Sequence, residues 1–190
     1  MKYYISDYHL GHFNALNFDD RPFSTVEEQT ETIVDKWNNF ITARDDVYLL
    51  GDIFWNNELL VPVLERLAGR KHLILGNHDR VTNSYKYFFY SIDTMLKIKD
   101  MGIYVTLCHY PIAHWEGADC GWIHLYGHIH AGRDCLPYLK YKRERIESGL
   151  PYNSYNVGCM LPYMDYQPRP LDYIIEKANQ WEEEQFALME

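Results

Sequence analysis

Five short apolar segments of the chain each end directly in a side chain that can bind a metal ion. The segments YYIS, VYLLG, LILG, YVTLC and IHLYG lead into Asp7, Asp52, Asn77, His109 and His128. Short apolar runs are typical of buried strands, and the carboxyl ends of parallel strands share one edge of a sheet, where ligands bind. We therefore expect these side chains to meet, joined by a histidine two residues after the first and another two residues after the last. This gives seven candidate ligands: Asp7, His9, Asp52, Asn77, His109, His128 and His130.

The order of the remaining segments indicates an α/β or mixed layered fold, because strand-like runs alternate with helical ones. Strands are expected at residues 2–6, 47–50, 72–75, 92–98, 103–108, 122–126 and 154–158, with a hairpin turn at 99–102. Helices are expected over residues 24–41 and 57–68 and from Leu171 onward.

Local signals refine these helices. Ser24 followed by Glu27 predicts a capping box at the start of the first helix. Pro62 in the second is compatible with the first turn or with a kink. The acidic run at 182–184 is expected to face solvent. The segment 132–153 is polar, basic and interrupted by proline, which predicts a long surface loop.

The composition narrows the class of protein. A length of 190 residues fits a single domain spanning residues 1–190, and 47% hydrophobic residues are typical of a folded chain. The net charge of −9 argues against broad nonspecific binding to nucleic acid or to an anionic membrane. The sequence shows no secretion signal, no membrane-spanning apolar run and no C-x-x-C pair, so we expect a cytoplasmic protein with free thiols and no membrane partner.

The seven nitrogen and oxygen ligands are more than one metal ion needs. Two divalent ions that share a bridging carboxylate would use all of them, as in binuclear sites whose ions lie about 3.5–4 Å apart and clamp phosphoryl groups. The set contains no thiolate, which favours Mn²⁺, with Fe or Zn as alternatives, over a soft metal or an iron–sulfur cluster. Each residue taken singly is more often a turn former, so the prediction depends on the whole set.

The same residues fall into five blocks in chain order: Asp7-x-His9, Gly51-Asp52, Gly76-Asn77-His78-Asp79, His109 and Gly127-His128-x-His130. These blocks resemble the signature blocks of the calcineurin-like metallophosphoesterases, and the first loop is similar to that of small bacterial and phage phosphoesterases. The resemblance implies a four-layer αββα sandwich with two mixed β-sheets flanked by helices. It also implies that Asp52 bridges two ions, with Asp7, His9 and His130 on one and Asn77, His109 and His128 on the other.

The resemblance further places His78 beside the substrate or leaving group, with Asp79 orienting it. The alternative for His78 is a turn or helix-cap residue. Two cations would lower the pKa of a bridging water, so that a metal-bridging hydroxide attacks a phosphomonoester or phosphodiester in line with the leaving group. His78 would then act as the general acid that protonates the departing oxygen.

Two classes of function remain open at this point: a metal-dependent phosphoesterase, and a catalytically inactive binding or scaffold module on the same fold. Every ligand position is filled, which favours the enzyme. His12 and Arg21 in the first loop are candidate substrate contacts, although Arg21 could equally form a surface salt bridge with Asp19 or Asp20. The substrate stays open among a phosphorylated small molecule, a nucleotide and a phosphoprotein, and Asn156 is assigned no role.

Overall fold

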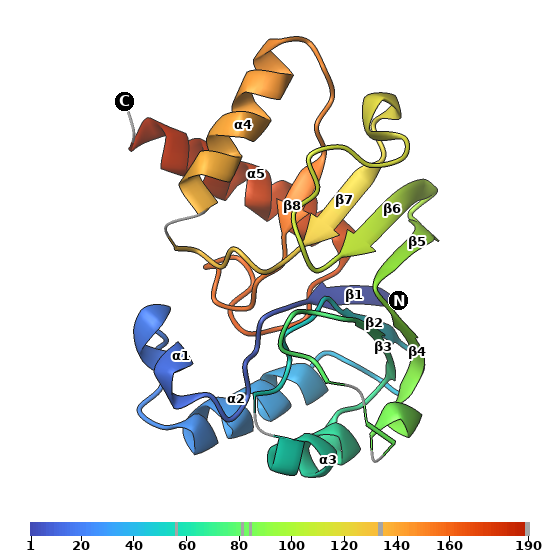
Figure 1. The fold of residues 1–190 in the computed structure, drawn as a ribbon, viewed down its shortest axis with the longest axis vertical. Coiled ribbons are helices and arrows are strands. Elements are labelled where there is room, and N and C mark those ends of the chain that lie inside the picture. Colours follow the sequence, from blue (N-terminus) through green and yellow to red (C-terminus); the bar gives the residue numbers. More distant parts are fainter. Residues whose placement is uncertain (56, 81, 84, 133–134, 189–190) are drawn as a thin grey trace.

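The strands of the protein form two four-stranded sheets (Figure 1). The computed structural model describes residues 1–55, 57–80, 82–83, 85–132 and 135–188. The first sheet contains four parallel strands in the order β1 (Lys2–Ile5), β2 (Asp46–Leu49), β3 (Arg70–Ile74) and β4 (Phe89–Asp93). In the second sheet the first strand is antiparallel to its neighbour and the rest are parallel, in the order β5 (Met95–Asp100), β6 (Ile103–Cys108), β7 (Ile123–Tyr126) and β8 (Ser154–Asn156).

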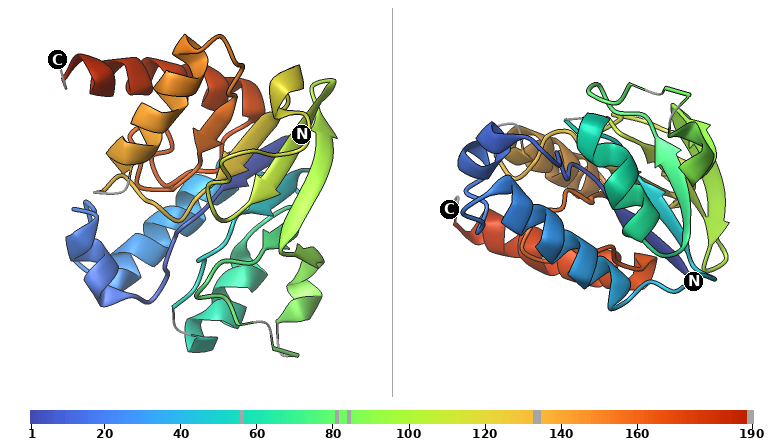
Figure 2. Two further views of the ribbon diagram at one scale, coloured as in Figure 1. Left: turned by 45° about the horizontal axis from the view of Figure 1, so that its top comes forward. Right: turned by 90° about the horizontal axis from the view of Figure 1, so that it is seen from below.

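Helices lie on the outer sides of the two sheets (Figures 1 and 2). In chain order they are α1 (Phe13–Phe18), α2 (Val26–Asn38), α3 (Asn57–Arg66), α4 (Cys135–Glu147) and α5 (Leu171–Ala187). Helices α2 and α3 cover the first sheet, whereas α4 and α5 lie beside each other against the second, where Lys142 of α4 donates to the Ser154 carbonyl of β8 at 2.7 Å. One hydrophobic cluster contains buried residues of both sheets, such as Leu49 and Leu125.

These layers confirm the expected αββα fold class. Mixed pairing is found within the second sheet. In the first sheet the antiparallel element among the described residues is an isolated bridge between Tyr4 and Arg169. None of the helices in the described part of the chain is long and apolar enough to cross a membrane.

The expected strand at 92–98 is wrong as a single element, because it includes the passage from one sheet to the other. Strand β4 ends at Asp93 and pairs with β3, whereas β5 begins at Met95 and pairs with β6. The backbone bends at Thr94, so a bend of one residue and a change of partner strands separate the two elements. The expected hairpin between β5 and β6 is confirmed, with Met101 (φ 48°) and Gly102 (φ 85°) in its turn.

The expected surface loop at 132–153 is wrong, since most of it forms α4. Pro137 is the third residue of this helix, within the first turn, where a backbone N–H has no intrahelical partner and proline is tolerated. Cys135 and Leu139 are buried against Phe186 of α5. Residues 133 and 134 lie outside the described part of the chain.

Part of the acidic run at 182–184 also differs from expectation. Glu182 is buried, and its carboxylate lies 2.7 Å from the amino group of Lys142, which is equally buried on α4. The ion pair therefore joins two helices that are distant in sequence. Glu183 and Glu184 are not among the buried charged residues, in line with the expected solvent-facing run.

Two details within α2 and α3 differ from expectation, although α3 begins at Asn57 as expected. The N-cap of α2 is Thr25 rather than Ser24: its Oγ1 accepts the N–H of Glu28 at 3.1 Å. The Glu28 carboxylate in turn accepts the N–H of Ser24 at 2.7 Å, so the capping box exists but is shifted by one residue. Pro62 lies in the second turn of α3 rather than the first.

Candidate metal centre

The candidate ligands lie on tight turns just beyond the strand ends, where the two sheets adjoin. Ser6, at the end of β1, forms a parallel bridge with Gly158, which follows β8, and the N–H of Asp7 donates to Gly51 beyond β2 at 3.0 Å. Five of the seven candidates have a left-handed backbone with φ between 47° and 71°: Asp7, His9, Asp52, His128 and His130. Such conformations are unfavourable for residues other than glycine and are concentrated at functional sites, which supports a functional role for these turns.

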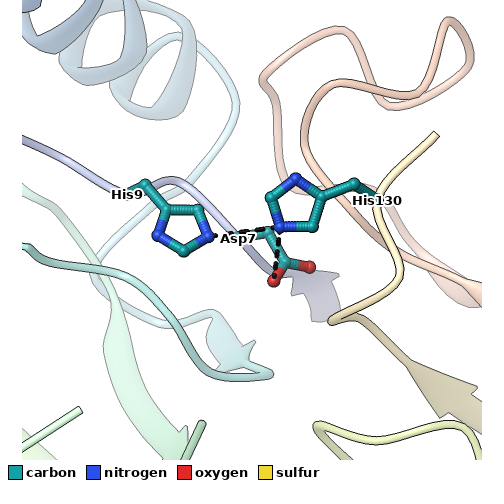
Figure 3. A group of neighbouring side chains, drawn as sticks. All are labelled: Asp7, His9 and His130. Atoms are coloured by element: carbon teal, nitrogen blue, oxygen red, sulfur yellow. Dashed lines mark hydrogen bonds and ion pairs between the residues drawn. The ribbon is translucent and has the colours of Figure 1, made fainter. Parts of the chain in front are cut away.

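Three of the candidates form a first ligand group, consisting of Asp7, His9 and His130. Their side chains point toward one another from two separate loops (Figure 3). The Nε2 atoms of His9 and His130 are 3.3 Å apart, and His130 Nε2 is 3.7 Å from Asp7 Oδ1. The ligand atoms lie within 4.8 Å of one another, a spacing that could hold one metal ion.

A second ligand group consists of Asp52, His109 and His128, with ligand atoms again within 4.8 Å of one another. Asn77 adjoins it, because its Oδ1 lies 3.1 Å from His109 Nε2. Asp52 lies between the two groups: its Oδ2 is 3.4 Å from His109 Nε2 and 3.9 Å from His9 Nε2. The structure therefore brings all seven candidates together, while metal binding by each of them remains a prediction.

The hydrogen bonds of the histidine rings show whether a cation fits. Nδ1 of His109 donates to the Leu50 carbonyl at 2.7 Å, and Nδ1 of His130 donates to Asp19 at 2.8 Å. In both rings the Nε2 atom is thus left for the site. His109 Nε2 faces two oxygen acceptors, those of Asn77 and Asp52, so a proton or a cation must lie there. The residues present fit a pair of divalent cations.

The electrostatics of the second group favour positive charge. Burial alone would raise the pKa of Asp52, but the hydrogen bond and charge of His109 hold it at about 2, so the carboxylate is ionised at neutral pH. Burial opposes protonation of His109, yet Asp52 and Asp7 raise its pKa to about 9. In the first group, burial followed by the neighbouring His130 lowers the pKa of His9 to about 3. A cation at His109 Nε2 would therefore compete with protonation of this ring.

His78 lies on the open side of the centre, where its side chain is 40% exposed and its Nε2 is 3.9 Å from Asp52 Oδ2. Its backbone N–H donates to Asp52 Oδ1 at 2.9 Å. We expected Asp79 to orient the His78 ring, but among the described residues its hydrogen bonds go elsewhere. The Asp79 carboxylate instead accepts the backbone N–H groups of Asp52 and Gly76, both at 2.9 Å, because the turn folds this side chain back beneath the ligand loops.

Arg21 does pair with Asp19, as the alternative expectation had it, but the pair is buried rather than on the surface. The Arg21 side chain is fully buried and pairs with Asp19 at 2.7 Å, and it donates to the carbonyls of Asp7 and Tyr8 at 2.9 and 2.6 Å. A guanidinium occupied in this way cannot contact a phosphate in the open site. Asp19 was not among the sequence candidates. Its proximity to Arg21 in the sequence was the available signal, but nothing local indicated that it would reach His130.

A hollow of about 350 Å³ opens above the two groups and is lined partly by aromatic rings. His12 borders it and stacks on Trp55, with ring centroids 3.9 Å apart. Trp55 and Phe18, which the sequence did not single out, are 48% and 54% exposed along this hollow. The hollow thus offers flat apolar surfaces beside the charged centre.

Asn156 supports the loop that carries His130. Its side-chain amide donates to the carbonyl of His130 at 3.0 Å, and its Oδ1 accepts the N–H of Gly158 at 2.9 Å. The residue therefore shapes the turn that carries His130.

Fold and site together define an α/β protein with two adjoining candidate metal-ligand groups at the ends of its strands. No family model matches the chain. Over 178 residues it is 32% identical to the uncharacterized protein MJ1445 of Methanocaldococcus jannaschii, with 92% of this chain and 89% of that protein covered. The chain belongs to the family of MJ1445.

Two further similarities extend beyond this relative. The gene 66 protein of Mycobacterium phage L5 is 28% identical over 161 residues, covering 68% of this chain and 77% of that protein. The crystal structure of AQ665, a protein of unknown function from Aquifex aeolicus, matches with a TM-score of 0.67 and 26% identity, covering 88% of this chain and 94% of that chain. The fold is therefore shared over most of the chain, and the function has to be argued from the site.

Proposed function

We propose that the chain is a binuclear metal-dependent phosphohydrolase that cleaves phosphomonoester or phosphodiester bonds. The observation that carries this proposal is the position of the Asp52 carboxylate, whose Oδ2 lies 3.4 Å from His109 and 3.9 Å from His9. It can serve both ligand groups, as a bridging ligand between two cations must. The order of the five sequence blocks, which resembles that of the calcineurin-like metallophosphoesterases, supports the same class of reaction.

The division of ligands follows from the two groups. In this proposal Asp7, His9 and His130 hold one cation, and Asn77, His109 and His128 hold the other. Two divalent cations would supply a nucleophile near neutral pH by lowering the pKa of water and would neutralise phosphoryl charge. Imidazole, carboxylate and amide donors without a thiolate suit Mn²⁺, with Fe and Zn as alternatives.

The residues around the hollow take the remaining roles. His78 is exposed beside Asp52 and can donate a proton to the leaving oxygen of a substrate in the hollow. His12 borders the same hollow and can offer a polar contact to the substrate. The opening suits a phosphorylated small molecule, a nucleotide or a phosphorylated protein side chain, whereas the net charge of −9 disfavours long nucleic acids.

The test combines metal analysis with turnover. The purified protein is stripped with a chelator and reloaded with Mn²⁺, after which metal content and hydrolysis of nitrophenyl phosphate and bis-nitrophenyl phosphate are measured. We expect two ions per chain and metal-dependent hydrolysis of at least one ester. The matched control is Asp52→Asn, which preserves side-chain volume but removes the bridging charge and should lose both properties.

The outcomes separate the two classes of function. Two bound ions without turnover across a panel of phosphomonoesters and phosphodiesters would favour the inactive binding module over the enzyme. A wild-type protein that binds no divalent cation would contradict the proposal itself.

A further inference from the structure

One buried arginine, Arg21, contacts the backbone that carries two residues of the first ligand group and the carboxylate that binds the third. Arg21 Nη2 donates to the carbonyl of Asp7 at 2.9 Å, and Nη1 donates to the carbonyl of Tyr8 at 2.6 Å. Tyr8 is the residue between the ligands Asp7 and His9. The planar fork of the guanidinium therefore holds the peptide groups on both sides of this residue.

The third ligand is reached through a carboxylate. Asp19 accepts from Arg21 Nε at 3.0 Å and from Nη2 at 2.7 Å. Its other oxygen accepts from Nδ1 of His130 at 2.8 Å. A carboxylate on the distal nitrogen of a metal-binding histidine selects its tautomer and fixes its ring orientation. The chain of contacts thus runs from Arg21 through Asp19 to His130.

The backbone that Arg21 holds is strained. Asp7 and His9 have φ angles of 60° and 48°, conformations that persist only where the surroundings enforce them. The side chain of Gln29 assists by donating to the same Tyr8 carbonyl at 2.8 Å. The second group has a different support, since Nδ1 of its His109 donates to a main-chain carbonyl, that of Leu50.

We infer that Asp19 and Arg21 are positioning residues that set the cation affinity of the first ligand group and leave that of the second largely unchanged. The inference rests on the proposed function only in requiring that both groups bind cations. Arg21 is fully buried behind the ligands and Asp19 borders the hollow, and in this inference both act by holding Asp7, His9 and His130 in place.

The experiment is a calorimetric titration of the metal-free full-length protein with Mn²⁺, in the wild type and in two variants. Asp19→Asn keeps the shape of the side chain but removes its charge, and Arg21→Lys keeps the charge but removes the fork. A His9→Ala variant identifies which of the two binding events belongs to the first group, because the Asp7 carboxylate also accepts the backbone N–H of His128 in the second group. We expect Asp19→Asn and Arg21→Lys to weaken that event by about 10- to 100-fold and to leave the other event within about threefold.

A matched control is available in another buried ion pair, Lys142 with Glu182, which joins α4 to α5. Glu182→Gln removes a buried charge of similar exposure on a helix that carries none of the candidate ligands. It should lower the melting temperature while leaving both Mn²⁺ affinities unchanged. If Arg21→Lys fails to fold, Asp19→Asn still carries the test, because it is isosteric.

The results that overturn the inference differ from those that overturn the proposed function. Equal weakening of both binding events, or a loss of stability with both affinities unchanged, would show that Asp19 and Arg21 are structural only. Selective weakening in a protein that hydrolyses no phosphoester would support the inference and contradict the phosphohydrolase. A wild type that binds no Mn²⁺ would contradict both.

Discussion

The two ligand groups lie side by side yet are supported in different ways. Charged side chains support the first group: Asp19 accepts a hydrogen bond from His130, and Arg21 donates to the loop from Asp7 to His9. Behind the second group stands the main chain, because His109 donates to the carbonyl of Leu50. The Asp79 carboxylate completes this second support by binding backbone N–H groups of the Asp52 and Gly76 turns.

This difference shows two routes to a rigid ligand geometry. The support of the first group consists of the side chains of Asp19 and Arg21, whereas that of the second combines the Asp79 carboxylate with backbone contacts, so we expect the first group to be the easier one to tune by single substitutions. A main-chain support needs close approach of backbones, and glycine provides it. A Cβ atom on Gly51 would lie 2.5 Å from His109 Nδ1 and 2.7 Å from the Cα of Gly76. A larger residue at Gly51 should therefore disturb the second group directly.

The largest effect is expected where the two groups share a ligand. Asp52→Ala should strip both cations and lower phosphoester turnover by more than about 10³-fold, because the shared charge between the groups is lost. Asp7→Ala should weaken mainly the first cation. Metal analysis of both purified variants decides between them, and two ions retained at full occupancy in Asp52→Ala would exclude a bridging role.

The next largest effect is expected at His78, which lies on the open side of the metal centre and supports neither ligand group. His78→Ala should retain both cations and slow alkyl phosphoesters by about 10²- to 10⁴-fold, because a poor leaving oxygen needs a proton. Nitrophenyl esters, whose leaving group needs less help, should be slowed much less. Parallel kinetics on the two ester types provide the measurement. Equal loss on both would indicate that His78 binds the phosphoryl group instead.

The main-chain support is tested by Gly51→Ala. The added methyl would clash with His109 at a backbone φ of 85°, so we expect a loss of at least about 3 kcal/mol in the free energy of unfolding and weaker binding of the second cation. Gly102→Ala is the matched control, since it has the same φ of 85° and no atom within 4 Å of its Cβ position.

Denaturant unfolding of both glycine variants separates the cost of the clash with His109 from the cost of backbone strain. Gly102→Ala should cost about 1 kcal/mol, the strain of the left-handed backbone alone. If the two variants lost equal stability, close packing against His109 would not be what requires glycine at position 51.

The smallest effect is expected for the pH dependence of stability, and it involves β7, the strand that leads to one ligand of each group. Strand β7 leads to His128 and His130, and within it His124 is fully buried, accepting from the N–H of Ile112 and donating to Thr106, both at 3.1 Å. Burial lowers the pKa of His124 from 6.5 to about 4. The folded state thus favours the neutral ring, so this stability is present above pH 6.5 and is lost as the pH falls toward 4.

The expected loss from this group is about 2 kcal/mol between pH 7 and pH 5. Urea unfolding of the metal-free protein at the two pH values measures it, and the reference is His124→Gln, which cannot titrate. A wild type and a variant with the same pH dependence would show that His124 does not control it.

The sequence alone was sufficient to predict which side chains meet. A buried strand carries a local signal in its apolar run, and residues at the carboxyl ends of parallel strands must share an edge. For this reason Asp7, Asp52 and Asn77, which follow three parallel strands of one sheet, were placed together from the sequence. His109 and His128 follow strands of the second sheet, so their meeting with the first three depends on how the two sheets adjoin. The capping box of α2 was predicted to within one residue for the same reason, because its signal lies within four residues.

Tertiary structure alone decided how those side chains are held. The partner of a polar residue depends on what faces it across space, and no local pattern records this. Arg21 could have faced solvent or a phosphate, yet it faces the carbonyls behind the first ligand group. Asp79 binds backbone N–H groups rather than its neighbour His78, and Glu182 pairs with Lys142 across two helices. Sequence determined the strand ends because their signal is local, whereas the supports behind them depend on long-range packing.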